Sequence, residues 1–325
     1  MAGGQERILR RRIKSVQSTK KITKAMELIA ASRIVKAQQR VDAARPYAEK
    51  ITAVIGNLAA GGAGLSSPLL IPRETVTKVG FVAVCADRGL AGAYNTNVIR
   101  ATERAILAAR AEGRDYGLIC VGKKAQSYFR FRGYTIDASF TGMSDQPAYE
   151  DARRVAAAVT EHFESGDYDQ VELVYTQFLS AATQRVAQRR FMPIDSELLE
   201  ATASEGPAAD YEFEPGPGLI LERLLPRYAE ARLFAAMLEA AASEHAARRR
   251  AMKSATDNAE ELIIKLSRIM NRARQDAITT EIMEIVGGAE AQSQGAADDD
   301  DLLIDHIGAQ DLFPQHRDQP HHDHV

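Results

Sequence analysis

The sequence predicts an α/β protein in which the N- and C-terminal helices form a long antiparallel two-helix coiled coil that carries an inserted Rossmann-like α/β domain. Near both ends of the chain, apolar residues recur at steps that alternate between four and three, as in a coiled-coil seam. The middle of the chain instead alternates short apolar runs with helical segments, as open α/β sheets do. Because neither terminal helix can bury its own apolar stripe, the two stripes are expected to pack against each other.

The first coiled-coil helix is expected within residues 1–60. Pro46 removes one backbone donor, but the seam keeps its phase across this residue, which favours a kink over a stop. Gly, Ser and Pro residues between Gly61 and Pro72 then predict a loop. The seam consists of Ala30, Ile34, Ala37, Val41, Ala44, Ala48, Ile51, Ile55 and Leu58.

The inserted Rossmann-like domain is expected over residues 70–195. Its short runs of β-branched and apolar residues are typical of parallel strands that are buried on both faces. Cys85 and Cys120 each lie in such a run, and buried thiols are favoured over a disulfide in a chain with only 2 cysteines. Strands are predicted at 79–85, 116–121 and 170–175, helices at 94–112, 123–132 and 149–164, and an edge strand at 183–191.

The second coiled-coil helix is expected over residues 218–289, after an acidic surface loop at 196–217. Gly287 and Gly288 predict its end. About 70 residues at ~1.5 Å each give roughly 105 Å, which is longer than one compact domain requires. The acidic, histidine-containing residues 290–325 lack a helical period and are expected to form a disordered tail. The seam consists of Leu221, Leu224, Tyr228, Ala231, Ala235, Leu238 and Ala242 and, after breaks at His245, Arg249 and Thr256, of Ala259, Ile263, Leu266, Met270, Ala273 and Ala277.

The formal net charge of −3 is unevenly distributed along the chain. The first 24 residues contain eight basic residues and a single acidic one, Glu6. This basic segment leaves open a coiled-coil scaffold that binds nucleic acid or an anionic membrane surface. Aromatic residues for base stacking or interfacial anchoring are missing from it, so an acidic protein surface fits equally well as its partner. No apolar run approaches the ~18 residues of a membrane span, and none is expected.

The sequence contains no catalytic constellation. Asp87-Arg-Gly-Leu-Ala-Gly92 follows a strand and precedes a helix, where a doubly wound fold holds a nucleotide. It lacks the third spaced glycine and the Lys-Ser/Thr pair of phosphate loops, so a tight turn is favoured over the cofactor site of a dinucleotide-dependent enzyme. The spacing of cysteines and histidines fits no zinc site. We therefore expect neither a cofactor nor a metal.

Several longer motifs, in order and with matching spacing, resemble the gamma subunit of F-type ATP synthases over about residues 1–290. The turn at residues 87–92, with Tyr94-Asn95, belongs to this set. The first helix contributes Lys21-Ile-Thr-Lys-Ala-Met26-Glu-Leu-Ile-Ala-Ala-Ser32 and Arg45-Pro-Tyr-Ala-Glu49, and the last helix contributes Ser243-Glu-His-Ala-Ala-Arg248, Ala251-Met-Lys-Ser-Ala-Thr-Asp-Asn258, Asn271-Arg-Ala-Arg-Gln275, Ile278-Thr-Thr-Glu281 and Glu284-Ile-Val-Gly-Gly-Ala289.

The resemblance implies a non-catalytic rotor shaft that couples rotation of a membrane c-ring to ATP synthesis at the beta subunits. Its implied partners are the alpha and beta subunits, the epsilon subunit and the c-ring, with no nucleic acid. The implied location is peripheral, on the cytoplasmic side of the cell (plasma) membrane. The implied contact residues are Met26, Lys21 and Lys24 at an acidic lever of beta, Arg274 and Gln275 at the beta catch loops, and Tyr211 and Glu214 on the side of the c-ring and epsilon.

Two departures from the family pattern carry expectations of their own. Arg249 stands where the family usually has an apolar residue, and it falls on the predicted seam. Its guanidinium is expected to point outward or to pair with an acid of the first helix. The tail beyond Ala291 is longer than usual, and we expect it to protrude and to contact the delta subunit.

Overall fold

The computed structural model describes residues 2–60, 67–194 and 216–304 of the chain. These residues form two compact units. The larger unit spans Thr19–Ala259 and contains the sheet, and the smaller one combines the described parts of residues 1–18 and 260–325. Each unit is described by itself below.

A five-stranded mixed sheet forms the centre of the larger unit, in the order β3-β2-β1-β4-β5. Four strands are parallel, and the edge strand β5 pairs antiparallel with β4. The predicted strands and the predicted edge strand are confirmed. The short strand β3 was missed, because its three residues carry no periodic pattern. The strand bounds are Lys78–Val84 for β1, Asp115–Val121 for β2, Ala138–Phe140 for β3, Gln170–Phe178 for β4 and Gln184–Met192 for β5.

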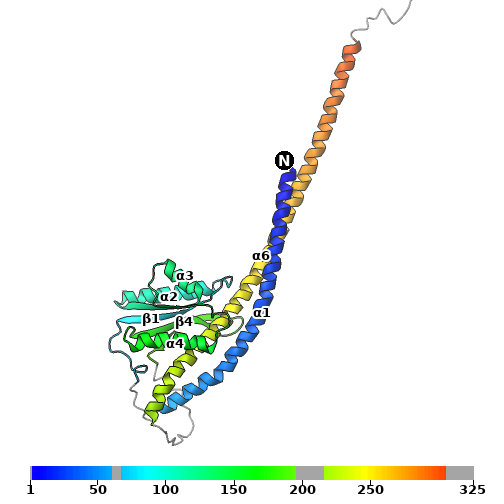
Figure 1. The fold of residues 1–325 in the computed structure, drawn as a ribbon. Coiled ribbons are helices and arrows are strands. Elements are labelled where there is room, and N and C mark those ends of the chain that lie inside the picture. The colour runs from blue at the N-terminus through cyan, green and yellow to red at the C-terminus, as the bar shows by residue number, and fades with distance from the viewer. Residues whose placement is uncertain (1, 61–66, 195–215, 305–325) are drawn as a thin grey trace, which may run out of the picture. The chain divides into compact units, whose positions relative to one another are not determined.

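Helices cover both faces of this sheet (Figure 1). On one face, α2 (Tyr94–Ala111) and α3 (Lys123–Phe131) bury a cluster that includes Phe81 and Leu118. On the other face, α4 (Tyr149–Glu164) and parts of the two long helices bury a larger cluster that includes Val82 and Ile119. Because neighbouring residues of a strand point to opposite faces, the strands β1 and β2, which are uncharged after their first residue, suit a sheet that is covered twice.

Two paired glycines make room for an aromatic ring on the sheet. Gly80 of β1 lies opposite Gly117 of β2 in the parallel register. A Cβ atom at Gly117 would lie 2.1 Å from the ring of Tyr168, and one at Gly80 would lie 2.5 Å from it. The buried Tyr168 hydroxyl donates to Asp137 at 2.6 Å. Glycine is therefore required at both positions by the ring that packs over them.

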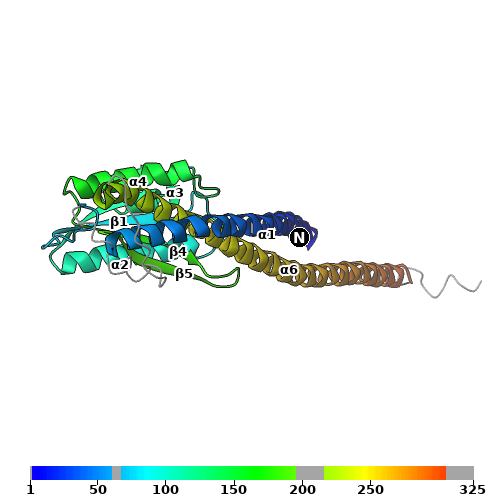
Figure 2. The same ribbon diagram turned by 90° about the horizontal axis from the view of Figure 1, so that it is seen from below.

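The two long helices are α1 (Ala2–Ala60) and α6 (Pro217–Ile304). Within the larger unit they lie side by side and run antiparallel (Figures 1 and 2). The coiled coil predicted from the two seams is confirmed there, and Pro46 lies inside α1 without ending it. The buried α6 side of the seam alternates alanines with larger leucine and tyrosine side chains. Buried seam residues are Ala30, Ile34, Ala37, Ile51, Ile55 and Leu58 of α1 and Leu221, Tyr228, Ala231, Leu238 and Ala242 of α6.

The predicted seam of α6 is wrong at one position. Arg249 is exposed, and the buried residue at this turn is its neighbour Arg248. The outward direction expected for the Arg249 side chain is confirmed. Arg248 tolerates burial because Glu244, one turn earlier on the same helix, pairs with it. A strictly alternating pattern could not anticipate this shift of phase.

The smaller unit continues both helices with the same kind of seam. Ile13 of α1 and Leu266 of α6 are buried, and Ile263, Met270 and Ala273 are half-buried. Ile263, Leu266, Met270 and Ala273 follow the spacing of three and four that the sequence predicted, so a coiled-coil seam is present within this unit.

The predicted end of the last helix at Gly287 and Gly288 is wrong, because α6 continues to Ile304. Neither glycine adopts a positive φ. A helical glycine costs only about 1 kcal/mol relative to alanine, and alanines at 289 and 291 resume a favourable sequence. Residues 290–304, expected in a tail, are therefore helical. The rest of the predicted tail, and the predicted loop up to residue 215, lie outside the described residues.

The two cysteines are free and buried, as predicted. Burial raises the pKa of the Cys120 thiol to about 12 and that of the Cys85 thiol well above its usual range. Both side chains therefore behave as small apolar residues of the sheet.

Candidate functional site

Helix α6 lies over the carboxyl ends of β1 and β4, the edge where doubly wound folds usually bind ligands. Ser243 of α6 is fully buried, and its hydroxyl donates to the carbonyl of Thr176 in β4 at 3.1 Å. Glu244 and His245 follow it into the interior. The crevice at the strand ends is thus largely filled by a helix of the same chain.

Seven residues, here called the polar junction, fix α6 to its neighbours beside this crevice. The junction joins α1, the turn after β1, the loop before α4 and α6, and all its members lie in the larger unit. Its members are Arg33, Asp87, Ser144, Asp145, Glu244, His245 and Arg248.

Glu244 and Arg248 form a buried ion pair within the junction. Glu244 is 1% exposed, and Arg248 Nη2 donates to its Oε1 at 2.5 Å. Burial raises the pKa of Glu244, and Arg248 opposes this shift. Arg248 Nη2 also lies 3.3 Å from the carbonyl oxygen of Gly89, so the pair connects α6 with the turn after β1. Such a pair specifies one arrangement of the helix more than it stabilises the fold.

Asp145 links the two long helices through the loop before α4. Arg33 of α1 donates to both carboxylate oxygens of Asp145, at 2.6 Å for Oδ1. His245 of α6 lies on the other side, with Nε2 3.3 Å from the Asp145 carbonyl oxygen. Burial lowers the pKa of His245, although Asp145 opposes the shift, so the neutral ring is favoured.

The Asp87–Gly92 motif forms a turn that receives α6. The Asp87 carboxylate accepts hydrogen bonds from the backbone amides of Lys123 at 2.9 Å and Ser144 at 3.0 Å. Burial raises the pKa of Asp87, but these amide contacts outweigh it and the pKa is lowered overall. Leu90 adopts a left-handed conformation at φ 61°. The preference for a tight turn over a phosphate loop agrees with these contacts, which serve loop and helix packing.

A threonine pair joins α1 directly to α6. The hydroxyls of Thr23 and Thr256 lie 2.8 Å apart, and both side chains are buried in the seam. Thr256 interrupted the apolar pattern of the sequence, and its partner explains why a polar residue is tolerated there. A paired polar contact in a seam fixes the register of two helices.

Five of the residues expected to contact other subunits lie on the two long helices. Met26 is half-buried and lines a cavity of about 270 Å³ beside Arg88 and His245. Lys21 and Lys24 are exposed on the same helix, and Lys24 pairs with Glu27 at 3.1 Å.

Arg274 and Gln275 are exposed on the part of α6 that belongs to the smaller unit. The two residues are consecutive in the sequence, and both side chains are exposed to solvent. Tyr211 and Glu214, expected on the side of the c-ring and epsilon, lie outside the described residues.

The polar junction was not predicted from the sequence as a site. Glu244, His245 and Arg248 belong to a motif that was singled out, but their partner Asp145 lies 100 residues from His245. The buried polar residues at breaks of the α6 seam were the available signal, since such residues require partners.

Within the described residues, no cluster of histidine, cysteine or acidic side chains has a composition suited to a metal. No helix in the described ranges has the length and hydropathy needed to cross a bilayer. Fold and site together define an α/β protein whose polar motifs hold a coiled coil against a sheet.

Comparison with known proteins identifies the family. Residues 5–292 match the family model described as ATP synthase. The ATP synthase gamma chain of Parafrankia sp. is 52% identical over 90% of this chain and 99% of its own length. The corresponding chain of Mycolicibacterium smegmatis is 48% identical over 88% of this chain and 97% of its own length. This chain belongs to the ATP synthase gamma chain family.

Solved structures agree at the level of the fold. A chain of the Euglena gracilis mitochondrial ATP synthase, in a structure of OSCP, F1 and c-ring, matches with a TM-score of 0.63 at 20% identity, over 96% of this chain and 100% of that chain. A chain of the central stalk and c-ring structure from Tetrahymena thermophila matches with a TM-score of 0.56 at 24% identity, over 72% of this chain and 99% of that chain. The expectation of a non-catalytic central-stalk subunit is confirmed, and it replaces the alternatives of a polyanion-binding scaffold and a dinucleotide-dependent enzyme.

Proposed function

We propose that this chain is the rotating shaft of an F-type, proton-translocating ATP synthase and couples rotation of the c-ring to ATP synthesis at the beta subunits. Its partners are the alpha and beta subunits of the catalytic hexamer, the epsilon subunit and the c-ring. It works as a peripheral protein on the cytoplasmic side of the cell membrane. The nucleotide chemistry belongs to its partners.

The observation that carries this proposal is the polar junction. A shaft must turn together with the domain through which it is driven. Here α6 is tied to the turn after β1 through Arg248 and to the loop before α4 through His245, and α1 is tied to the same loop through Arg33. These contacts are buried or half-buried, and buried polar contacts allow few alternative arrangements. Torque applied to the α/β domain of the larger unit is thereby passed to both helices.

Exposed and half-buried residues of the helices supply the contacts that distinguish one rotor angle from another. Alternating affinities at the surrounding catalytic sites require such differential contacts. We assign Met26, Lys21 and Lys24 to an acidic lever of beta, and Arg274 with Gln275 to its catch loops. The exposed cations Lys21 and Lys24 suit an acidic lever, and the exposed Arg274 and Gln275 can hydrogen-bond to loops.

Two further contacts are proposed from the sequence. We assign Tyr211 and Glu214 to the side of the c-ring and epsilon, and the segment after Ala291 to the delta subunit. Pull-down of tagged full-length chain from solubilised membranes, with subunit identification, tests the partners. Recovery without alpha and beta would contradict the proposal. If a chain truncated after Ala291 recovers the delta subunit as well as the full-length chain does, the contact assigned to the tail is contradicted.

Changing Arg274 and Gln275 together to alanine is expected to lower coupled ATP synthesis at least severalfold. Both side chains are exposed, so their loss should leave the unfolding temperature nearly unchanged. ATP synthesis in inverted membrane vesicles and thermal unfolding of the chain measure the two effects. Lys265→Ala, exposed on the same helix, is the control. Equal losses of stability and synthesis would show that the pair is merely structural.

A further inference from the structure

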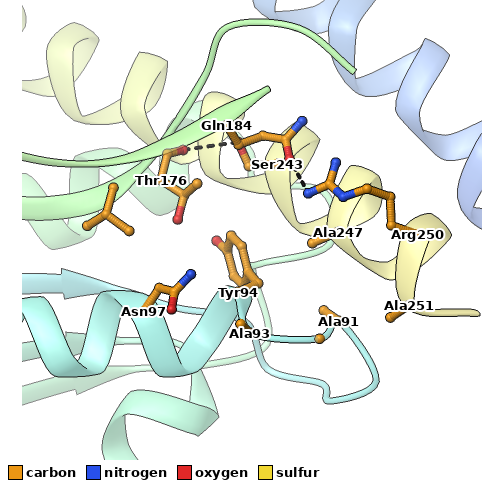
Figure 3. A pocket seen from close by; sticks show the side chains of 12 residues that line it. Ala91, Ala93, Tyr94, Asn97, Thr176, Gln184, Ser243, Ala247, Arg250 and Ala251 are labelled. Carbon is orange, nitrogen blue, oxygen red and sulfur yellow. Dashed lines mark hydrogen bonds between the residues drawn. The ribbon is translucent and has the colours of Figure 1, made fainter. Parts of the chain in front are cut away.

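A polar cavity of about 400 Å³ remains beside the crossing of α6 over the sheet (Figure 3). It is lined by the turn before α2, the first turns of α2, β4, β5 and α6, all within the larger unit. None of its lining residues belongs to the polar junction, and none is acidic. The polar lining residues are Tyr94, Asn97, Thr176, Gln184, Ser243 and Arg250.

Thr176 presents an unpaired hydroxyl to this cavity. The residue is 6% exposed, and its Oγ1 has no hydrogen-bond partner within the described residues. Figure 3 shows the hydroxyls of Thr176 and Tyr94 pointing into the same space. The Thr176 carbonyl is already satisfied by Ser243. Since a buried hydroxyl without a partner is unfavourable, this one points to a ligand.

Arg250 gives the cavity a positive charge. Its Nη2 donates to the side-chain oxygen of Gln184 at 2.5 Å, and its Nη1 lies 3.3 Å and 3.4 Å from the carbonyl oxygens of Ala181 and Ala182. Among the residues that the structure covers, no carboxylate pairs with this guanidinium. The Arg250 side chain is exposed, and neutral groups hold its charge beside the cavity without a paired carboxylate.

The N-terminus of α2 adds a second source of positive potential. Its cap residue is Ala93, which offers no side-chain acceptor, and its first turn contains no acidic residue. Gly92 and Ala93 both line the cavity. The dipole at the start of an 18-residue helix favours an anion placed there. The backbone amides of Tyr94 and Asn97 already donate to Ala91 and Ala93, so the dipole and not these amides makes the contribution.

We propose that this cavity binds a small oxyanion of the phosphate class, held by Arg250, the Thr176 hydroxyl and the first turn of α2. The site goes beyond the coupling role, which requires no ligand on this chain. Its position at the carboxyl edge of a parallel sheet is where phosphate groups bind in doubly wound folds. The volume lies at the small end of ligand sites.

Isothermal titration of the full-length chain with inorganic phosphate, at constant ionic strength, tests the proposal. Binding is expected, and Arg250→Gln should weaken it about tenfold or more, because a charge-assisted contact is lost. Thr176→Val should weaken it severalfold, and Thr176→Ser should restore much of the loss. The matched control is Arg249→Gln, which removes the same charge from a neighbouring, likewise exposed arginine that does not line the cavity and should bind like the parent chain. Parallel titration with ADP separates free phosphate from a phosphorylated nucleoside as the ligand.

Two results would overturn the proposal. The first is absence of binding, or an equal loss for Arg249→Gln and Arg250→Gln, which would indicate non-specific charge. The second concerns Thr176→Val, which removes an unpaired hydroxyl and should raise the melting temperature of the ligand-free chain. If it does so without changing phosphate affinity, the cavity holds only water.

Discussion

At the scale of single residues, the buried polar side chains of the larger unit explain why its apolar patterns are broken where they are. His245 and Thr256 interrupt the α6 seam, and each has a polar partner from another segment. The same logic applies to Gly80 and Gly117, whose missing side chains make room for the ring of Tyr168. A break in a pattern is predictable from the sequence, but the partner that justifies it is not.

His245 is expected to make stability depend on pH. Its pKa is lowered from about 6.5, chiefly by burial, so the fold favours the neutral ring. The contribution is fully present above the unfolded pKa and is lost as the pH falls below about 6.5 towards the folded pKa. The charged groups around it are Asp145, Arg248 and Arg33. The raised pKa of Glu244 has the opposite effect, because its contribution to stability increases as the pH falls.

The measurement is the free energy of unfolding between pH 8 and pH 5 for the parent chain and for His245→Gln. As the pH falls, the free energy of unfolding of the parent chain should decrease relative to that of His245→Gln, because only the parent chain has a buried imidazole to protonate. Parallel pH profiles for the two chains would show that His245 does not titrate in this window.

Gly117→Ala is expected to destabilise the fold by about 1–3 kcal/mol, because overpacking forces the Tyr168 ring to move. The new Cβ atom would lie 2.1 Å from that ring. Gly89→Ala is the matched control, since its Cβ atom meets nothing closer than 3.7 Å. Denaturant unfolding compares the two variants. A loss no larger for Gly117→Ala than for Gly89→Ala would contradict the packing described here.

At the scale of helices and strands, the sequence predicted most elements but not all of their limits. Short apolar runs located the strands β1, β2 and β4, an alternating polar pattern located β5, and helical periodicity located every long helix. The strand β3 is too short to carry a period. The end of α6 was placed too early, because Gly287 and Gly288 are common at helix ends but are not sufficient to end a helix. The phase of the α6 seam shifted because an ion pair within the helix permits burial of Arg248.

The seam shift predicts opposite behaviour for two adjacent arginines. Arg248→Ala leaves Glu244 buried without its partner and should cost about 3–5 kcal/mol at pH 8. Arg249→Ala removes an exposed side chain and should have little effect on stability. Urea unfolding of both variants provides the comparison. The seam predicted from the sequence would instead place Arg248 on the surface, so that Arg248→Ala would be harmless. It would also make Arg249→Ala neutral or stabilising through better packing. A harmless Arg248→Ala would therefore contradict the structure.

At the scale of the whole molecule, family membership and the polar junction lead to the same account. The chain provides no catalytic group of its own to the complex, and its contribution is mechanical. What the sequence established about function came from long motifs spread over α1, the middle domain and α6. What it left open was how the α/β domain holds the coiled coil, since Arg33, Asp145 and His245 meet only in the folded chain.

The central claim is that α1 and α6 turn as one body with the sheet of the larger unit. It is tested most directly by replacing Thr23 and Thr256, whose hydroxyls lie 2.8 Å apart, with cysteines in the assembled complex. Oxidation should form a disulfide between the two helices, and proton-driven ATP synthesis should remain at the level of the reduced complex. Efficient cross-linking that abolishes synthesis, and recovery on reduction, would show that the helices must move past each other and would contradict the account.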